Sequence, residues 1–488
     1  MQAKMEEKQL IYEKSVPGKT GLTLPETERS ESELLAGIPE KFHRRNDAAL
    51  PEVTEGEVMR HYVNLSVKNH HIDRGFYPLG SCTMKYNPKL NDKAAGMEGF
   101  AALHPLTPCD AAPGSLRLMY DLSEYLKEIS GFDAISLQPV AGAQGEFVGL
   151  LIIRAYHLDQ GRLRKKILIP DSAHGTNPAS VNMAGFQTVT IKSGPKGIIS
   201  AEEVRNMVDD DTAGLMLTNP NTVGLFESNI EEIAKIIHDA GGLIYMDGAN
   251  LNAQLGIVQP GKIGFDILHF NLHKTFSTPH GGGGPGAGAV GVVEKLAKYL
   301  PSPMIEKVPE SGKLYLDYDR PKSIGRIHGY YGNFANSVRA YAYIRTLGAN
   351  GLRAVSENAI INANYLKALV KDEYEMPYDT VCQHEFVLSC SRQKKMGAKA
   401  LDLAKRLLDY GFHAPTVYFP LIVPEAFMIE PTETESKNTL ERFASVLIEI
   451  SKEAEKDPEK LQNAPYNTPV RRLNEVKAAR ELDVAYQG

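Results

Sequence analysis

The segment Leu243-Ile-Tyr-Met-Asp-Gly-Ala-Asn250 is a short apolar run that ends on an acidic residue and a glycine. Such a run, bounded by turn residues, is typical of a strand that is buried on both faces of a sheet. Similar runs recur on both sides of it, and stretches such as Ala201–Val208 and Asn229–Ala240 between them carry apolar residues at helical spacing. Strands that alternate with helices predict an α/β fold with a mostly parallel sheet covered on both faces. The seven predicted strands are Ala134–Leu137, Ile167–Ile169, Thr188–Ile191, Gly214–Leu217, Leu243–Met246, Ile267–Phe270 and Ala289–Val293.

The pattern changes toward both ends of the chain. Residues 1–50 are polar and charged with several prolines and glycines, which predicts an extended arm with little core of its own. After Tyr299 the sequence predicts long helices, a further strand and two more helices. These segments are Gly329–Leu347, Leu352–Val370, Glu385–Ser389 (the strand), Ala398–Tyr410 and Lys437–Glu455. Because 488 residues are too many for one compact core, we predict three parts. They are an N-terminal arm with an active-site loop segment (1–114), a large domain built on the sheet (115–330) and a smaller α+β C-terminal domain (331–488).

Composition excludes several classes of function. The net charge is −6 and the pI is about 6.2, so no strong positive field attracts nucleic acid or an anionic membrane surface. No stretch approaches the roughly 20 apolar residues of a membrane span, and the charged N-terminus lacks a secretory signal core. The four cysteines show no CxxC spacing, which argues against a disulfide framework and against a zinc site built from cysteines. We expect a cytoplasmic protein without a metal.

Chemically useful residues follow four of the predicted strands. They lie in Gln138-Pro-Val-Ala-Gly-Ala-Gln-Gly145, in Ile169-Pro-Asp-Ser-Ala-His-Gly-Thr176, in the opening segment, and in Phe270-Asn-Leu-His-Lys-Thr-Phe276 with the glycine run Gly281–Gly284 after it. In sheets of this kind ligands bind at the carboxyl ends of the strands. The four segments are therefore candidates for one binding site.

Each segment also has an ordinary structural explanation. The glycine turn before Phe147 suits a tight strand–helix connection, and His174 suits a hydrogen-bonded structural histidine. Asp247 suits a helix cap or a turn. Most lysines are solvated surface charges, but Lys274 directly follows an apolar strand and lies beside His273, which is unusual. Taken singly, these segments leave the structural and the catalytic interpretation open.

Taken together, the four segments match the needs of pyridoxal phosphate (PLP). This cofactor needs a lysine amine that forms an imine, a carboxylate against its pyridine nitrogen, a phosphate cradle and a flat group against its ring. Lys274 and Asp247 meet the first two needs. The glycine turn offers backbone and helix N–H groups to the phosphate, and His174 offers the flat group. The combination predicts that the 115–330 domain binds PLP, with Lys274 as the Schiff-base residue.

The same segments resemble a known family. The aspartate and the His-Lys pair resemble fold-type I PLP enzymes in general. The strings GFYPLGSCTMKYNP (75–88), QPVAGAQGE (138–146), SAHGTNPAS (172–180), MDGANLNA (246–253) and LHKTFSTPHGGGGPG (272–286) resemble the glycine decarboxylase P-protein of the glycine cleavage system. The likeness runs from about residue 60 to the C-terminus. The length resembles the second, PLP-carrying subunit of the split form of this family.

The resemblance implies an activity and partners. It implies that glycine displaces Lys274 from the imine, that carbon dioxide leaves, and that the aminomethyl group passes to the lipoyl arm of H-protein. It also implies a P-protein subunit 1 as partner, in an α2β2 heterotetramer.

The resemblance also implies roles for individual residues. Asp247 is then the partner of the ring nitrogen, His174 stacks on the ring and Ala249 packs on its other face. Gly142, Ala143 and His273 then hold the phosphate. The 76–88 loop then shapes a small glycine pocket, where Tyr77, Pro78 and Met84 are bulky enough to close it.

Two other interpretations stay open. One is a different fold-type I PLP enzyme, a decarboxylase or an aminotransferase without a lipoyl acceptor. The other is a structural or regulatory subunit that keeps the fold without catalysis. The presence of both Lys274 and Asp247 argues against the second, because a subunit without catalysis has no need of either residue.

Overall fold

The computed structural model describes residues 9–23, 25–46, 48–280 and 286–486, and the chain divides into two compact units at His71 and Ile72. The first unit contains the helices α1 (Glu31–Leu35) and α2 (Glu55–Ser66). Helix α2 begins at a capping box in which Thr54 and Glu57 accept each other's backbone N–H groups. Among the described residues of this unit, Val53 and His61 are buried, so it has little core.

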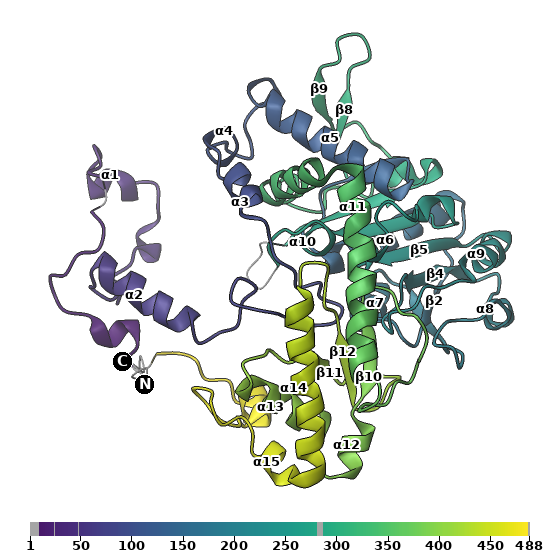
Figure 1. Cartoon of the computed structure of the whole chain (residues 1–488). Helices are drawn as coiled ribbons and strands as arrows, with labels where there is room; N and C mark the ends of the chain where they lie inside the picture. The colour runs from purple at the N-terminus through teal and green to yellow at the C-terminus, as the bar shows by residue number, and fades with distance from the viewer. Residues whose placement is uncertain (1–8, 24, 47, 281–285, 487–488) are drawn as a thin grey trace. The chain divides into compact units, whose positions relative to one another are not determined.

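A seven-stranded sheet forms the centre of the second unit among the described residues, in the order β1-β7-β6-β5-β4-β2-β3 (Figure 1). Strand β7 pairs antiparallel with β1 and β6, and the other neighbours are parallel. The strands are β1 (Ala134–Ser136), β2 (Lys166–Pro170), β3 (Gln187–Ile191), β4 (Thr212–Thr218), β5 (Leu243–Gly248), β6 (Ile267–Asn271) and β7 (Gly288–Val292). The predicted mostly parallel sheet and its seven strands are confirmed.

Both faces of this sheet are covered, which explains the continuous apolar runs of its strands. On β4, Leu215 and Leu217 belong to one core cluster and Met216 to another, as expected for side chains that alternate between faces. Helix α9 contributes Ile233 to the first cluster, and α6 contributes Ile152 to the second. The main helices around the sheet are α5 (Pro113–Ser130), α6 (Gly142–Asp159), α7 (Thr176–Met183), α8 (Ala201–Met207), α9 (Ile230–Asp239) and the short α10 (Leu272–Thr275).

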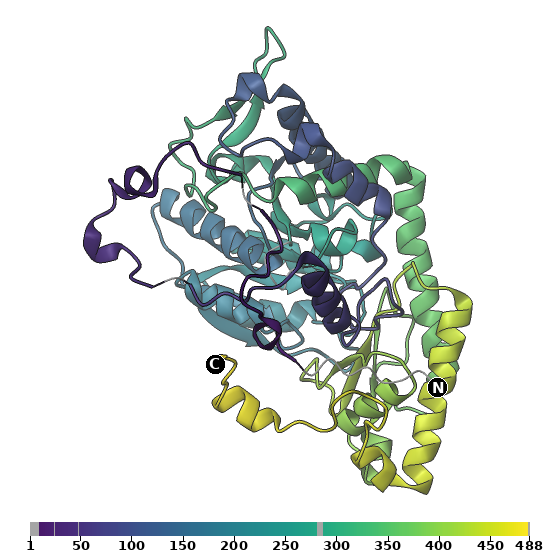
Figure 2. The ribbon, with the colours of Figure 1, turned by 90° about the vertical axis from the view of Figure 1, so that its left-hand side faces the viewer.

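The C-terminal part has a core of its own, formed by a small antiparallel sheet and its helices. The sheet has the order β10-β12-β11. Helices α11 and α14, drawn in green and in yellow at the right of Figure 2, pack against each other. Helix α11 is interrupted at Gly348, whose φ is +61°, between the two helices that the sequence predicts. It begins at Phe334 rather than Gly329, because Gly332 just before it also has a positive φ. The elements are α11 (Phe334–Val370), β10 (Phe386–Ser389), α12 (Ser391–Lys395), α13 (Ala400–Asp409), β11 (Thr416–Val417), β12 (Ala426–Ile429), α14 (Lys437–Lys456), α15 (Pro458–Gln462) and α16 (Glu475–Arg480).

Smaller elements complete the described chain. They are the helices α3 (Lys89–Ala95) and α4 (Glu98–Ala101) and the hairpin of β8 (Met304–Lys307) and β9 (Leu314–Asp317). No helix in the described part of the chain combines the length and the apolar character that crossing a membrane requires. The domain boundaries predicted at 114/115 and 330/331 stay predictions.

Candidate active site

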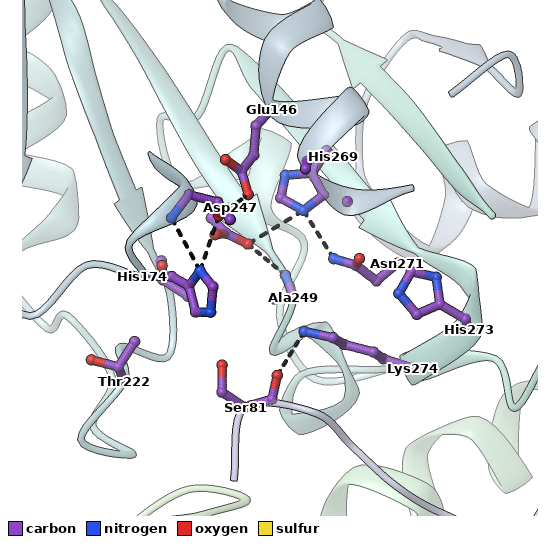
Figure 3. A pocket seen from close by; sticks show the side chains of 14 residues that line it. Ser81, Glu146, His174, Thr222, Asp247, Ala249, His269, Asn271, His273 and Lys274 are labelled. Carbon is purple, nitrogen blue, oxygen red and sulfur yellow. Dashed lines mark hydrogen bonds and ion pairs between the residues drawn. The ribbon is translucent and has the colours of Figure 1, made fainter. Parts of the chain in front are cut away.

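A pocket lies at the carboxyl edge of the large sheet, where the ends of β4, β5 and β6 meet the start of α6 (Figure 3). It contains about 580 Å³ of empty space, part of it open to solvent. All seven predicted site residues line it, although they are spread over more than 130 positions of the sequence (274 − 142 = 132). The lining residues are Ser81, Gly142, Ala143, Glu146, His174, Thr176, Thr218, Thr222, Asp247, Ala249, His269, Asn271, His273 and Lys274. The glycine run Gly281–Gly284 lies outside the described residues.

Lys274 lies on α10, the single helical turn that follows β6 directly. The buried side chains of Leu272 and Thr275 anchor this turn in the core. The Lys274 ammonium donates a hydrogen bond to the backbone carbonyl of Ser81 at 2.7 Å. Ser81 belongs to the 75–88 loop, so this loop reaches the pocket through a backbone carbonyl. Tyr77, Pro78 and Met84, the bulky residues expected to close the pocket, are not among the residues that line it.

Asp247 lies near the end of β5 and is buried, with 3% of its surface exposed. Its Oδ1 accepts the backbone N–H of Ala249 at 2.9 Å and lies 3.4 Å from Nε2 of His269, and its Oδ2 accepts the side-chain amide of Asn177 at 3.1 Å. Burial by itself would raise the pKa of Asp247, but these neighbours hold that pKa below its ordinary value. The pocket therefore contains a carboxylate that stays ionised although it is buried.

The start of α6 offers an anion site. Its first intrahelical bond runs from Gly145 N–H to the Ala141 carbonyl at 3.0 Å, and Ala141 has no capping side chain. The N–H groups of Gly142 and Ala143 therefore have no intrahelical acceptor. A Cβ on Gly142 would lie only 2.3 Å from Oδ1 of Asn271, so the helix starts this close to β6 because the residue is glycine. Two free N–H groups at a helix N-terminus suit a phosphate.

The remaining predicted residues surround the same space. His174 is exposed in the open pocket, and its Nδ1 lies 3.0 Å from Oγ1 of Thr176. Burial lowers the pKa of His273 to about 4, so its ring is neutral near pH 7. Its Nδ1 lies 2.9 Å from the Ala287 carbonyl and 3.4 Å from the Ala287 nitrogen. The shorter contact is a hydrogen bond that Nδ1–H donates to the carbonyl, so Nε2 of the neutral ring is an acceptor and carries a proton only when the ring is charged.

Two buried ionisable side chains of the pocket, Glu146 and His269, were not predicted from the sequence. Glu146, on α6, accepts hydrogen bonds from Thr176 and Ser180, and burial with the nearby charge of Asp247 raises its pKa to about 7. His269, inside β6, contacts the hydroxyl of Tyr245 through Nδ1 at 2.5 Å. A charged residue directly before the apolar run 147–153 and a histidine inside an apolar strand were the available signals.

A metal ion is a weaker match than an organic phosphate for this pocket. Ligand atoms of Glu146, Asp247 and His269 lie within 4.8 Å of one another, as a metal site requires. However, both oxygens of Glu146 and both oxygens of Asp247 already accept hydrogen bonds. The lysine amine and the N–H groups of the first turn of α6 instead suit an aldehyde and a phosphate.

Several solved structures share the fold of this chain. Glycine decarboxylase (P-protein) of the glycine cleavage system, in an inhibitor-bound form, aligns with a TM-score of 0.73 at 19% identity over 88% of this chain and 99% of its own. Sphingosine-1-phosphate lyase from Burkholderia pseudomallei aligns with a TM-score of 0.61 at 16% identity, over 87% and 96%. A C-DES variant with glycine covalently linked to its PLP cofactor aligns with 0.60 at 13% identity, over 77% and 96%. The chain has the fold of the fold-type I PLP enzymes.

Sequence comparison shows the family. The family described as glycine cleavage system P-protein matches residues 29–311, and the one described as glycine dehydrogenase, C-terminal domain, matches residues 355–471. Proteins named probable glycine dehydrogenase (decarboxylating) subunit 2 are 58% identical in Chloroherpeton thalassium and 56% identical in Bacillus velezensis. Each match covers 98% of this chain and 97% of the relative. The chain belongs to the glycine cleavage system P-protein family, and the predicted resemblance is confirmed.

Proposed function

We propose that this protein is the PLP-carrying subunit of a glycine dehydrogenase (decarboxylating). In this proposal it removes the carboxylate of glycine and transfers the aminomethyl group to the lipoyl arm of H-protein, as one step of glycine cleavage. The observation that carries the proposal is one pocket that brings together Lys274, the ionised Asp247 and the N–H groups of the first turn of α6, in a chain that matches its family over nearly its whole length. Four free cysteines support a reducing, cytoplasmic location.

The pocket residues fit PLP in defined roles. Lys274 would be joined to the cofactor covalently, and Asp247 would face the pyridine nitrogen and keep it protonated. Gly142 and Ala143 would hold the phosphate, and His273 would join them in its protonated form, which the negative charge of a phosphate favours. His174 and Ala249 would lie against the two faces of the ring. When bound, PLP supplies an electron sink for the bond that breaks as carbon dioxide leaves.

The chain's own part is to position groups and to hold charge. Asp247 stays negative because its two oxygens receive hydrogen bonds and because His269 lies beside it. Glu146 lies next to that charge with a pKa near 7, so it carries a proton for part of the time at neutral pH, which limits the repulsion between the two carboxyls. Lys274 has the Ser81 carbonyl as an acceptor whenever it is not joined to the cofactor.

We further propose that the chain works with a P-protein subunit 1, as an α2β2 heterotetramer, and with lipoylated H-protein. The relatives are named as subunit 2, which supports a partner subunit. The test is the exchange of labelled bicarbonate into the carboxyl group of glycine. We expect rapid exchange when the chain, subunit 1 and lipoylated H-protein are all present, and little exchange when any one is left out.

The same assay separates the competing functions. Exchange that is equally fast with unlipoylated H-protein would favour an ordinary PLP decarboxylase. Keto-acid formation from an amino acid without release of carbon dioxide would favour an aminotransferase. A protein that does not take up PLP at all would favour a structural subunit. Full exchange by the chain and H-protein alone would contradict the need for subunit 1.

The α6 N-terminus gives a prediction about cofactor affinity. Gly142→Ala is expected to weaken PLP binding about tenfold, ~1.4 kcal/mol, because the new Cβ must displace Asn271 and the first turn of α6. The control is Gly114→Ala. Gly114 lies in the first turn of α5, which has the same length as α6, 18 residues. A Cβ at Gly114 would meet nothing within 4 Å. Titration of both cofactor-free variants with PLP measures the effect. Equal affinities of the two variants for PLP would contradict a phosphate site at the start of α6.

A further inference from the structure

A second group of ionisable side chains lies buried beside the pocket. It consists of His384, Glu385 and Glu430, each with 0% of its surface exposed, at the start of β10 and the end of β12. Nε2 of His384 lies 3.6 Å from Glu385 and 4.0 Å from Glu430. Neither ring nitrogen of His384 has a hydrogen-bond partner among the described residues. None of these residues lines the pocket, and the roles assigned so far do not use them.

The two glutamates bind the 75–88 loop where it meets the pocket. Glu385 accepts the backbone N–H of Ser81 at 2.7 Å. Glu430 accepts both the backbone N–H and the hydroxyl of Thr83, at 2.8 and 2.6 Å. The loop runs beside β12 here, where Gly80 N–H donates to the Met428 carbonyl at 3.2 Å. The carboxylates therefore hold the turn from the side that faces away from solvent.

The turn needs such support because of its backbone conformation. Ser81 has φ +62° and Thr83 has φ +50°, in the left-handed region that residues other than glycine rarely adopt. Backbone in such a conformation persists only where the surrounding structure holds it in place. The result of this conformation is that the Ser81 carbonyl receives the ammonium of Lys274, while the Ser81 N–H is bound to Glu385. One residue thus connects a buried carboxyl group to the lysine.

The pKa shifts of the two glutamates are consistent with a connection to Lys274. Burial, and then repulsion from Glu430, raise the pKa of Glu385 well above its ordinary value, and burial raises the pKa of Glu430 to about 6. The positive charge of Lys274 acts in the opposite direction on both carboxyls. A buried carboxyl pair beside a lysine is thus less costly than the pair alone.

We propose that Glu385 and Glu430 are positioning residues for Lys274: they hold the Ser81–Thr83 turn so that the Ser81 carbonyl fixes the lysine nitrogen where the cofactor arrives. The inference rests on the proposed function, because it assumes that PLP is joined to Lys274. A fixed nitrogen reaches the cofactor aldehyde more often than a mobile one. The amine attacks the aldehyde carbon, one water leaves, and no oxidant or reductant is needed.

The experiment measures how fast the cofactor-free protein takes up PLP covalently, from the growth of the absorbance band of the lysine–PLP link. Glu385→Ala removes the acceptor of the Ser81 N–H and is expected to slow the link at least tenfold. Glu385→Gln is expected to stay within about threefold of the wild type. Its amide oxygen can still accept the Ser81 N–H, while its NH2 group faces the unpartnered His384. Hydrogen exchange of the Ser81 and Thr83 amides in the cofactor-free protein should rise only in Glu385→Ala.

Asp266→Ala is the matched control. Asp266 is also a buried carboxylate that accepts a backbone N–H, that of Ile244, but at the edge of the sheet opposite the pocket. The Asp266→Ala variant should have a lower melting temperature but should form the lysine–PLP link as fast as the wild type. If Glu385→Ala does not fold, Thr83→Val serves instead. It keeps the shape of the side chain, loses the hydroxyl bond to Glu430 and should slow the link several-fold.

The outcomes separate this inference from the proposed function. A wild-type protein that forms no link at Lys274 overturns the proposed function. A wild type that forms the link, with Glu385→Ala or Thr83→Val equally fast, overturns the positioning role alone. A Glu385→Gln variant as slow as Glu385→Ala also overturns it, because charge rather than the hydrogen-bond acceptor would then be what matters.

Discussion

The Lys274→Ala variant is expected to show no measurable glycine-dependent exchange and to bind PLP only weakly. The variant loses the amine that joins the cofactor, and no other lysine lines the pocket among the described residues. The fold should survive, because the Lys274 ammonium has a single hydrogen-bond acceptor in the described part of the chain, the Ser81 carbonyl. The buried carboxyls nearby lose a positive neighbour, and Glu430, with a pKa near 6, can take up a proton in response.

The position of the cofactor is measured by treating the wild-type holoenzyme with borohydride and locating the modified peptide by mass spectrometry. We expect the pyridoxyl group on Lys274. Lys85 is an internal control, since it is a buried lysine on the 75–88 loop. Its ammonium already has three acceptors, and the charge of Glu433 and the hydrogen bonds raise its pKa despite burial. A label on Lys85 or elsewhere would show that the assignment of Lys274 is wrong.

The Asp247→Asn variant is expected to fold and to lose about a hundredfold in rate, equivalent to ~3 kcal/mol. A neutral amide cannot keep the pyridine nitrogen protonated. The exchange of an oxygen for an NH2 group is tolerated locally, because Oδ1 of the neighbouring Asn177 has no partner among the described residues and can accept the new donor after its amide turns. The oxygen that accepts the Ala249 N–H can stay in place.

The measurement compares single-turnover rates and melting temperatures of the two proteins at saturating PLP. A rate close to that of the wild type would contradict the role of Asp247. Glu146→Gln is a matched control, because Glu146 is a second buried carboxyl in the same pocket but is not assigned to the cofactor. We expect it to lose much less rate than Asp247→Asn. An equal loss of rate in both variants would mean that the carboxyl groups of Asp247 and Glu146 act as one unit.

Much of the fold and of the cofactor site follows from local sequence. The central strands β4, β5, β6 and β7 were predictable because each is buried along its whole length, and because turn residues bound them. The edge strand β3 has only its last residue buried. Asp247 and Lys274 were predictable because each follows its strand within a few residues, and the carboxyl ends of parallel strands meet at one edge. The motifs around these two residues are continuous strings of sequence, so the family resemblance also follows from local sequence.

Tertiary structure alone brought in the groups that surround these residues. Ser81 meets Lys274 across 193 positions of the sequence, and Glu430 meets Thr83 across 347. No local sequence pattern predicts a contact between residues so far apart in the chain, since each contact depends on how the C-terminal sheet packs against the 75–88 loop. The raised pKa values of Glu146 and Glu430 have the same origin, because burial and neighbouring charges arise only in the folded chain. The sequence by itself determined the sheet and the residues for cofactor chemistry, whereas packing between distant segments decided what holds those residues in position.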